Sequence, residues 1–133
     1  MAVKGWNVVS YHRHMAERDA RDVPSGWPTA VGPPGSEDWE ASAASWLLDL
    51  LPEYRQYTAI ARHPVVLAYI ARHVLNGAVE GARQGYRTTR SELGELVPPH
   101  VIDAALNDCR TEGRRLAAAA RALELVERAL RSK

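Results

Sequence analysis

The residues best suited to chemistry in this sequence are histidines that lie close to carboxylates. His12 and His14 are two positions apart, and Glu17 follows His14 by one helical turn. Imidazole nitrogen and carboxylate oxygen are common zinc ligands in proteins. The two histidines would share a face on a strand, but the helix predicted here places them on different sides. The pattern therefore predicts no metal site at this position.

A second pair, His73 and Glu80, lies two turns apart on one side of another predicted helix, with Gly77 leaving space between them. Metal sites in helical bundles usually combine Glu-x-x-His spacing with ligands from facing helices. The sequence contains no such spacing. His73 is therefore interpreted as a partly buried, hydrogen-bonded side chain, and we predict neither a metal nor a cofactor.

Signatures of catalysis are also missing from the sequence. It has no Gly-rich phosphate loop after a strand, no GxSxG and no HExxH motif. Cys109 falls on an apolar helical seam, where cysteine normally behaves as a small hydrophobic residue. The sequence favours a protein that is not an enzyme.

Composition indicates one soluble globular domain. The chain has 133 residues, of which 46% are hydrophobic and 25% charged, with a net charge of +1. A single cysteine excludes an internal disulfide. The longest apolar run, residues 65–71, is too short to cross a bilayer. We expect a cytoplasmic protein without a membrane partner.

The first 36 residues are predicted to form a helix and an extended arm. Residues 7–22 have helical spacing, although a strand over residues 6–11 is the competing interpretation. Residues 23–36 contain four Pro and three Gly, a composition that favours an extended connector. Trp27 is expected to fix this connector on the core. Residues 37–133 would then form the helical part of a single domain.

From residue 37 the pattern is helical, and it predicts an all-α, compact bundle of five to six helices. Helices are expected at 37–50, 52–61 and 64 to about 84, the first with Trp39, Ala43 and Leu47 on one face. Thr89 and Glu92 form a capping box that predicts the start of another short helix. Pro99 suits the first position of a long last helix, 99 to about 131.

Glycines recur every four residues at Gly77, Gly81 and Gly85. Each glycine inside a helix costs roughly 1 kcal/mol relative to alanine, so their common face requires a reason. We predict a flat ridge on which another helix packs closely, with residues 117–120 as the expected partner surface. The alternative is that the helix ends at Gly77.

The last helix carries an apolar seam of coiled-coil type. Thirty-three residues would extend over roughly 50 Å, longer than the roughly 36 Å diameter of a compact domain of this size. Either the helix breaks at Gly113, or its end is buried by a second copy or by the N-terminal arm. We expect a homodimer, and the residues predicted to mediate it are Leu116, Ala120, Leu123, Val126 and Leu130.

Two ion pairs, Glu124–Arg128 and Glu127–Arg131, are spaced i,i+4 on the same helix. Pairs of this kind stabilise a helix modestly. They are interpreted as part of a solvated face.

Residues 88–115 suggest a second function. The fragments SELGEL, Ile102 with Ala105–Leu106, and Glu112–Gly113 resemble the second and third helices of winged helix-turn-helix repressors. That resemblance implies DNA binding. From their positions around the candidate recognition helix, the residues available for such contacts are Arg83, Arg87, Arg90, Asn107, Arg114 and Arg115. The turn is shorter than in that family and contains two prolines. Helical sequence also continues where the β-wing should begin.

Charge weighs against the DNA hypothesis. The candidate recognition helix carries Asp103, Asp108 and Glu112 but a single arginine, Arg110. DNA affinity depends mainly on positive groups that neutralise phosphates. The sequence therefore predicts a non-catalytic interaction or scaffolding module that self-associates through its C-terminal helix and has an unidentified protein partner. The alternative is a helix-turn-helix-like DNA-associated regulator that uses residues 88–115.

Overall fold

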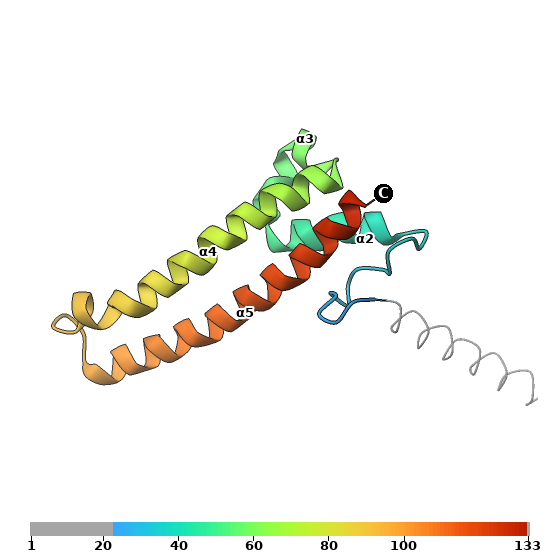
Figure 1. Cartoon of the computed structure of the whole chain (residues 1–133). Helices are drawn as coiled ribbons and strands as arrows, with labels where there is room; N and C mark the ends of the chain where they lie inside the picture. Colours follow the sequence, from blue (N-terminus) through green and yellow to red (C-terminus); the bar gives the residue numbers. More distant parts are fainter. Residues whose placement is uncertain (1–22, 133) are drawn as a thin grey trace, which may run out of the picture.

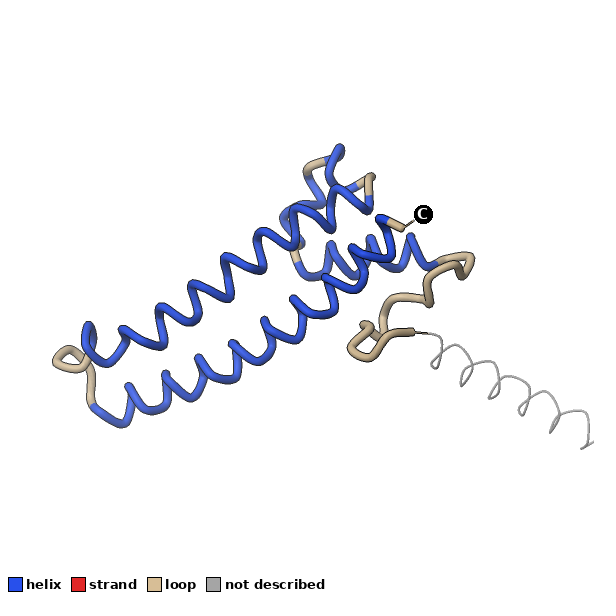
Figure 2. The backbone as a smooth tube through the Cα atoms, viewed as in Figure 1, coloured by secondary structure: helices blue, strands red, loops and turns tan. Residues whose placement is uncertain are grey.

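The computed structural model describes residues 23–132, and these residues are helical with irregular connections (Figures 1 and 2). They contain α2 (Trp39–Leu50), the 3-10 helix η1 (Pro52–Gln56), α3 (Thr58–Ala61), α4 (Pro64–Leu93) and α5 (Pro99–Arg131). No strand occurs in this part of the chain, so the all-α prediction is confirmed for it. The helix predicted at 7–22 lies outside the described residues.

The shape is a long helical hairpin with its core at one end (Figure 1). Helices α4 and α5 run antiparallel, and α2, η1 and α3 gather beside the end where α4 begins and α5 finishes. The described residues hold four α-helices, so the expected compact bundle of five to six is not confirmed. The helix lengths explain why the fold is a long hairpin and not a compact bundle: α4 and α5 have 30 and 33 residues, whereas α2 has only 12.

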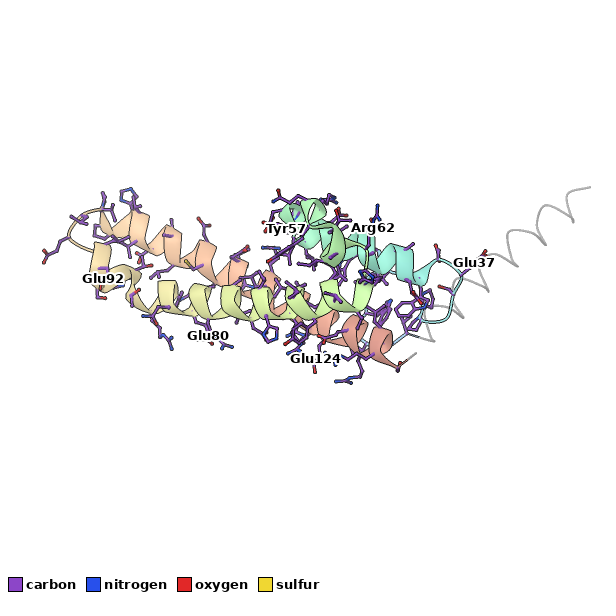
Figure 3. The ribbon with its side chains drawn as sticks, turned by 90° about the horizontal axis from the view of Figure 1, so that it is seen from above. Glu37, Tyr57, Arg62, Glu80, Glu92 and Glu124 are labelled. Atoms are coloured by element: carbon purple, nitrogen blue, oxygen red, sulfur yellow. The ribbon has the colours of Figure 1, made fainter. Side chains whose placement is uncertain are left out.

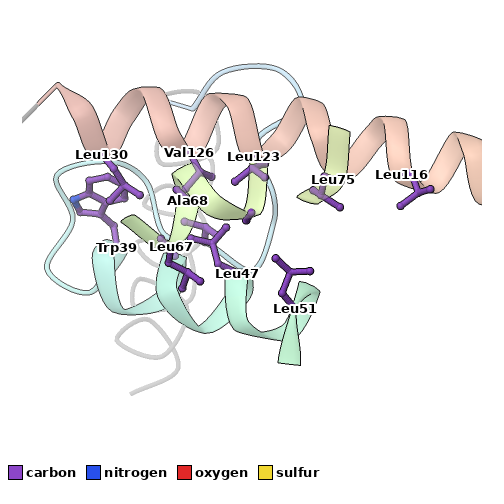
Figure 4. Close-up of a cluster of buried hydrophobic side chains, with 13 residues drawn as sticks. Trp39, Leu47, Leu51, Leu67, Ala68, Leu75, Leu116, Leu123, Val126 and Leu130 are labelled. Carbon is purple, nitrogen blue, oxygen red and sulfur yellow. The ribbon is translucent and has the colours of Figure 1, made fainter. Parts of the chain in front are cut away.

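The core forms where α2 crosses the hairpin (Figure 4). Trp39, Ala43 and Leu47 are spaced by four residues and bury one face of α2, as the sequence predicts. Burial of these side chains against α4 and α5 removes apolar surface from water, which is the main stabilising contribution to folding. The hydrophobic cluster comprises Val31, Trp39, Ala43, Leu47, Leu51, Leu67, Ala68, Ala71, Leu75, Leu116, Leu123, Val126 and Leu130.

The N-terminal connector is irregular, as its proline content predicts, and it is held on this core. The indole nitrogen of Trp27 donates a hydrogen bond to the Val31 carbonyl at 2.9 Å, and its ring lies 6.4 Å from that of Trp39. The backbone N–H of Gly32 donates to the Ser42 hydroxyl at 2.9 Å. The arm therefore packs on α2 through Trp27, and the expectation that this tryptophan fixes the connector is met.

Helix α4 starts at Pro64, as predicted, but continues to Leu93 instead of ending near residue 84. Its glycines do not break it, and the predicted capping box is wrong because Thr89 lies inside the helix. The Thr89 hydroxyl donates to the Gly85 carbonyl one turn earlier. The helix stops at Gly94, where an added Cβ would lie 2.5 Å from the Arg90 carbonyl oxygen.

Helix α5 covers the range predicted for it and passes Gly113 without a break. The apolar face of its C-terminal half is buried, so the overhang lies at the opposite end of the helix from the one expected. Between residues 99 and 115, Ile102 is the one buried side chain. The prediction that this helix exceeds the core is therefore right about length and wrong about which end protrudes.

The segment predicted as one helix at 52–61 is divided into η1 and α3. Tyr57 separates them with φ −96° and ψ 89°, outside the helical region. No helix of residues 23–132 has both the length and the apolar character needed to span a membrane.

Candidate functional site

The residues predicted to mediate self-association lie mainly in the core of the single chain (Figure 4). Leu116, Leu123, Val126 and Leu130 are at most 7% exposed. Ala120 alone among the five remains half-buried at a surface. The other four side chains belong to the hydrophobic cluster that also contains Val31, Trp39 and Leu47, so a second copy cannot reach them without opening the core.

The three glycines of α4 do not pack against another helix of the described chain. An added Cβ at Gly77, Gly81 or Gly85 would meet no other atom within 4 Å. The expected close packing on residues 117–120 of the same chain is therefore absent. Val79 and Ala82, from a different side of α4, line a hollow together with Ala117 instead.

This open environment predicts that alanine is tolerated at the glycine positions. Because added methyl groups meet no atoms, Gly81→Ala should raise the free energy of unfolding of the monomer by about 0.5–1 kcal/mol through helix propensity. Gly94→Ala is the matched control and should be destabilising because of its contact with the Arg90 carbonyl. Chemical denaturation at low protein concentration measures both. Destabilisation by Gly81→Ala would show that a neighbour already contacts this face.

Residues 76–115, called here the distal hairpin, are thinly packed. Within this range Ile102 is buried, and the rest are half-buried or exposed. Large apolar side chains are exposed at its tip, with Leu93 at 43%, Leu96 at 76% and Val101 at 41%. The distal hairpin contains six Arg and six carboxylates, so its formal charge is zero.

A groove runs between α4 and α5 along one side of the hairpin. Three hollows of about 290, 420 and 610 Å³ form it, and neighbouring hollows share lining residues. The hollows of about 290 and 420 Å³ share Val79, Arg83 and Ala117. The hollows of about 420 and 610 Å³ share Asn76, Ala120 and Arg121.

The groove lies away from the smaller helices. Glu80 and Glu124 line it, and both lie on the side of the hairpin opposite Tyr57 and Arg62 (Figure 3). All of its lining residues belong to α4 and α5. This side of the hairpin is therefore open along the part of the chain that the structure describes.

At the core end of the groove, Glu127 is held by two arginines. Its carboxylate accepts from Arg72 Nε at 2.6 Å and pairs with Arg131 at 2.8 Å, and the residue is 4% exposed. Burial raises the pKa of Glu127, but hydrogen bonds from the two guanidinium groups outweigh it, and the pKa lies below its ordinary value. Arg72 and Arg131 also lie over the ring of Tyr69, at 5.3 and 5.9 Å from its centre.

The interpretation of Glu127–Arg131 as part of a solvated face is therefore wrong for Glu127. Sequence spacing reveals the i,i+4 partner but not Arg72, which is 55 positions away. One feature of the sequence pointed to the burial of Glu127: this residue directly follows Val126, which belongs to the apolar seam.

The arginines proposed for DNA contact do not form one surface. Arg83 and Arg87 line the groove. Arg90 pairs with Asp103 at 2.7 Å, which joins the two helices near the turn. The other four bond to side chains of their own helix: Arg83 to Glu80, Arg87 to Gln84, Arg114 to Thr111 and Arg115 to Glu112.

The helix-turn-helix pattern also lacks its separate first helix, because residues 88–93 belong to α4. Asn107, the proposed adenine-reading residue, is exposed on α5. The two helices that flank the turn are long and antiparallel (Figure 1). The structure therefore presents residues 88–115 as the tip of a hairpin.

The histidine and the cysteine considered as candidate functional groups, His73 and Cys109, make only packing contacts in the described part of the chain. His73 is exposed, and its ring lies edge-on to Tyr69 at 4.7 Å, so the expected burial and hydrogen bonding are not found. Cys109 is half-buried and lines the groove. Among residues 23–132, no three or more His, Cys, Asp or Glu side chains lie close enough to hold a metal ion.

Comparison with known proteins identifies no relative. No family model, no curated protein and no solved structure matches this chain. Functional inference therefore depends on the hairpin and the groove themselves.

Proposed function

We propose that this protein is a non-catalytic helical interaction module that self-associates through its distal hairpin. The observation that carries the proposal is the extension of α4 and α5 well past the core, with apolar side chains left half-buried or exposed. An isolated pair of helices buries little surface, and most helices in proteins are stabilised by tertiary packing. A second copy would supply the missing packing.

Charge supports pairing of two copies. The six Arg and six carboxylates of the distal hairpin cancel, so two such hairpins carry no net repulsion. Many of these charges are already paired within the chain, including Arg83 with Glu80 and Arg90 with Asp103. Exposed Leu93 and Leu96 at the tip add apolar surface that association would remove from water.

The glycine face is the proposed contact. Gly81 and Arg83 are two positions apart, which places them roughly 160° apart around the helix, so the glycines lie away from the groove. Small residues let helix axes approach to the near end of the usual range of about 8–10 Å. Two hairpins joined in this way would form a four-helix bundle.

A non-catalytic role is supported by the state of the charged groups. The pKa values of Arg72, Glu112, Arg115 and Glu127 are shifted by hydrogen bonding and charge within ion pairs, and burial opposes each shift. Perturbed groups at catalytic sites are typically poised for proton transfer, whereas ion pairs of this kind serve structure.

The test is the mass in solution. Light scattering after gel filtration should give twice the 14.7 kDa of one chain. Gly81→Arg places a long charged side chain on the glycine face and should shift the mass to that of a monomer. Ser45→Arg introduces the same side chain at an exposed position of α2 and should leave the dimer intact. A monomeric wild type, or a dimer insensitive to Gly81→Arg, would contradict the proposal.

A further inference from the structure

The groove between α4 and α5 concentrates positive charge. Seven Arg and three Glu line it, an excess of four positive charges. The whole chain has a net charge of only +1, so the residues outside the groove have a net charge of −3. Charge is therefore separated on this molecule, although its overall composition is nearly balanced.

Three of these arginines have no carboxylate partner among the described residues. Arg110 bonds to the Tyr86 hydroxyl at 2.7 Å and lies over that ring, and Arg87 bonds to the Gln84 side chain. Arg121 has no hydrogen-bonding or ionic partner in this part of the chain. These three guanidinium groups are available to carboxylates of another molecule.

The floor of the groove is apolar in the two hollows nearer the turn, whereas the hollow at the core end is lined mainly by charged side chains. Small side chains lie along α5 at Gly113, Ala117 and Ala120, and Val79 and Ala82 face them from α4. All five are half-buried, so apolar surface remains to be covered. A floor of small residues lets a third helix settle between the other two.

The dimensions suit a helix of moderate length. The groove follows α5 from Cys109 to Arg131. At 1.5 Å per residue that distance is roughly 33 Å, the length of a helix of about 22 residues. Arg110 and Arg121 are three turns apart on its α5 side, and Arg87 lies on the α4 side.

We propose that this groove binds an acidic amphipathic helix of a partner protein. The partner places small and aliphatic side chains on the floor and carboxylates along both flanks, with two of them about three turns apart to reach Arg110 and Arg121. The apolar floor supplies contact area, and the arginines set orientation and speed association. The groove lies away from the glycine face, so this proposal stands independently of self-association.

A nucleic acid fits the groove less well than such a helix. Duplex DNA carries one negative charge per about 1.7 Å, which amounts to about 20 charges over the length of the groove. The three uncommitted arginines would neutralise only a small part of that charge. Phosphates would also leave the apolar floor uncovered, whereas an amphipathic helix satisfies both features.

The experiment uses the full chain and labelled synthetic peptides. The probe is a peptide of 22 residues with Leu and Ala on one helical face and Glu on both flanks, and binding is followed by fluorescence anisotropy. We expect saturable binding that weakens with salt. A peptide of the same composition in scrambled order has equal charge but no apolar face, and it should not bind. Equal binding of the scrambled peptide would overturn the proposal, since charge alone would then explain the attraction.

Matched charge reversals locate the site on the protein. Arg121→Glu should weaken binding of the acidic peptide about tenfold. Arg62→Glu makes the same change at an exposed position on the other side of the hairpin (Figure 3) and should leave the affinity unchanged. Equal affinities for Arg121→Glu and the wild type would place binding elsewhere and refute the assignment. Tighter binding of a 20-base-pair DNA duplex than of the peptide would also refute it.

Discussion

Replacement of Leu123 by alanine is expected to lower the free energy of unfolding by about 3 kcal/mol. Leu123 is fully buried where α5 meets α2 and α4 (Figure 4). Truncation removes the transfer free energy of its side chain and leaves a cavity that the helices fill only in part. Urea denaturation followed by circular dichroism measures the change.

Leu96→Ala is the matched control for this prediction. Leu96 is 76% exposed at the hairpin tip, so the same truncation should change the stability of the monomer, measured at low protein concentration, by less than about 0.5 kcal/mol. Light scattering distinguishes the two possible roles of Leu123. If Leu123→Ala left stability unchanged but converted a dimer to a monomer, the C-terminal seam would be an interface and the core described here would be wrong.

Replacement of Glu127 by glutamine is expected to cost about 2 kcal/mol. The change keeps the shape of the side chain but removes the charge that Arg72 and Arg131 share. Loss of one partner from a fully buried ion pair costs about 3–5 kcal/mol. The cost expected for Glu127→Gln lies below this range because the side chains of Arg72 and Arg131 are 36% and 54% exposed and remain partly hydrated.

The same residue predicts a pH dependence. The pKa of Glu127 is lower in the folded protein than its ordinary value of 4.5. The ionised carboxylate therefore stabilises the fold at pH values above 4.5, and this contribution is lost as pH falls below that value through the lowered pKa. Glu127→Gln should flatten this part of the stability profile, measured by urea denaturation across the acid range.

Glu124→Gln provides the comparison for Glu127. Glu124 pairs with Arg128 at 3.2 Å, but its side chain is 63% exposed. An exposed pair of this kind contributes about 0.5 kcal/mol or less. If both glutamine variants had equal effects on stability and on its pH dependence, burial of the Glu127 pair would have no energetic consequence.

The two helix starts at proline could be predicted from the sequence because they depend on local chemistry. Pro64 and Pro99 lack an N–H that the first turn of a helix would leave unpaired, and both begin helices where expected. The buried face of α2 followed directly from residues spaced by four. These features require no knowledge of distant parts of the chain.

Helix ends and the site depended on contacts that spacing does not reveal. Thr89 has the composition of a capping residue, yet its hydroxyl bonds back to Gly85 inside a continuous helix. The direction of the overhang depended on where α2 packs on the hairpin. The groove depended on pairing across α4 and α5, which brings Arg72 to Glu127.

The uneven packing of α5 has a consequence for its dynamics. One unbroken helix of 33 residues joins a fully packed segment around Leu123 to a segment near His100 with little cover. Local opening free energies in a protein range from near zero at frayed ends to the global value in the core. We therefore expect backbone amides at the two ends of this single helix to exchange with solvent as different cooperative units, with the tip unwinding and re-forming while the C-terminal half stays folded.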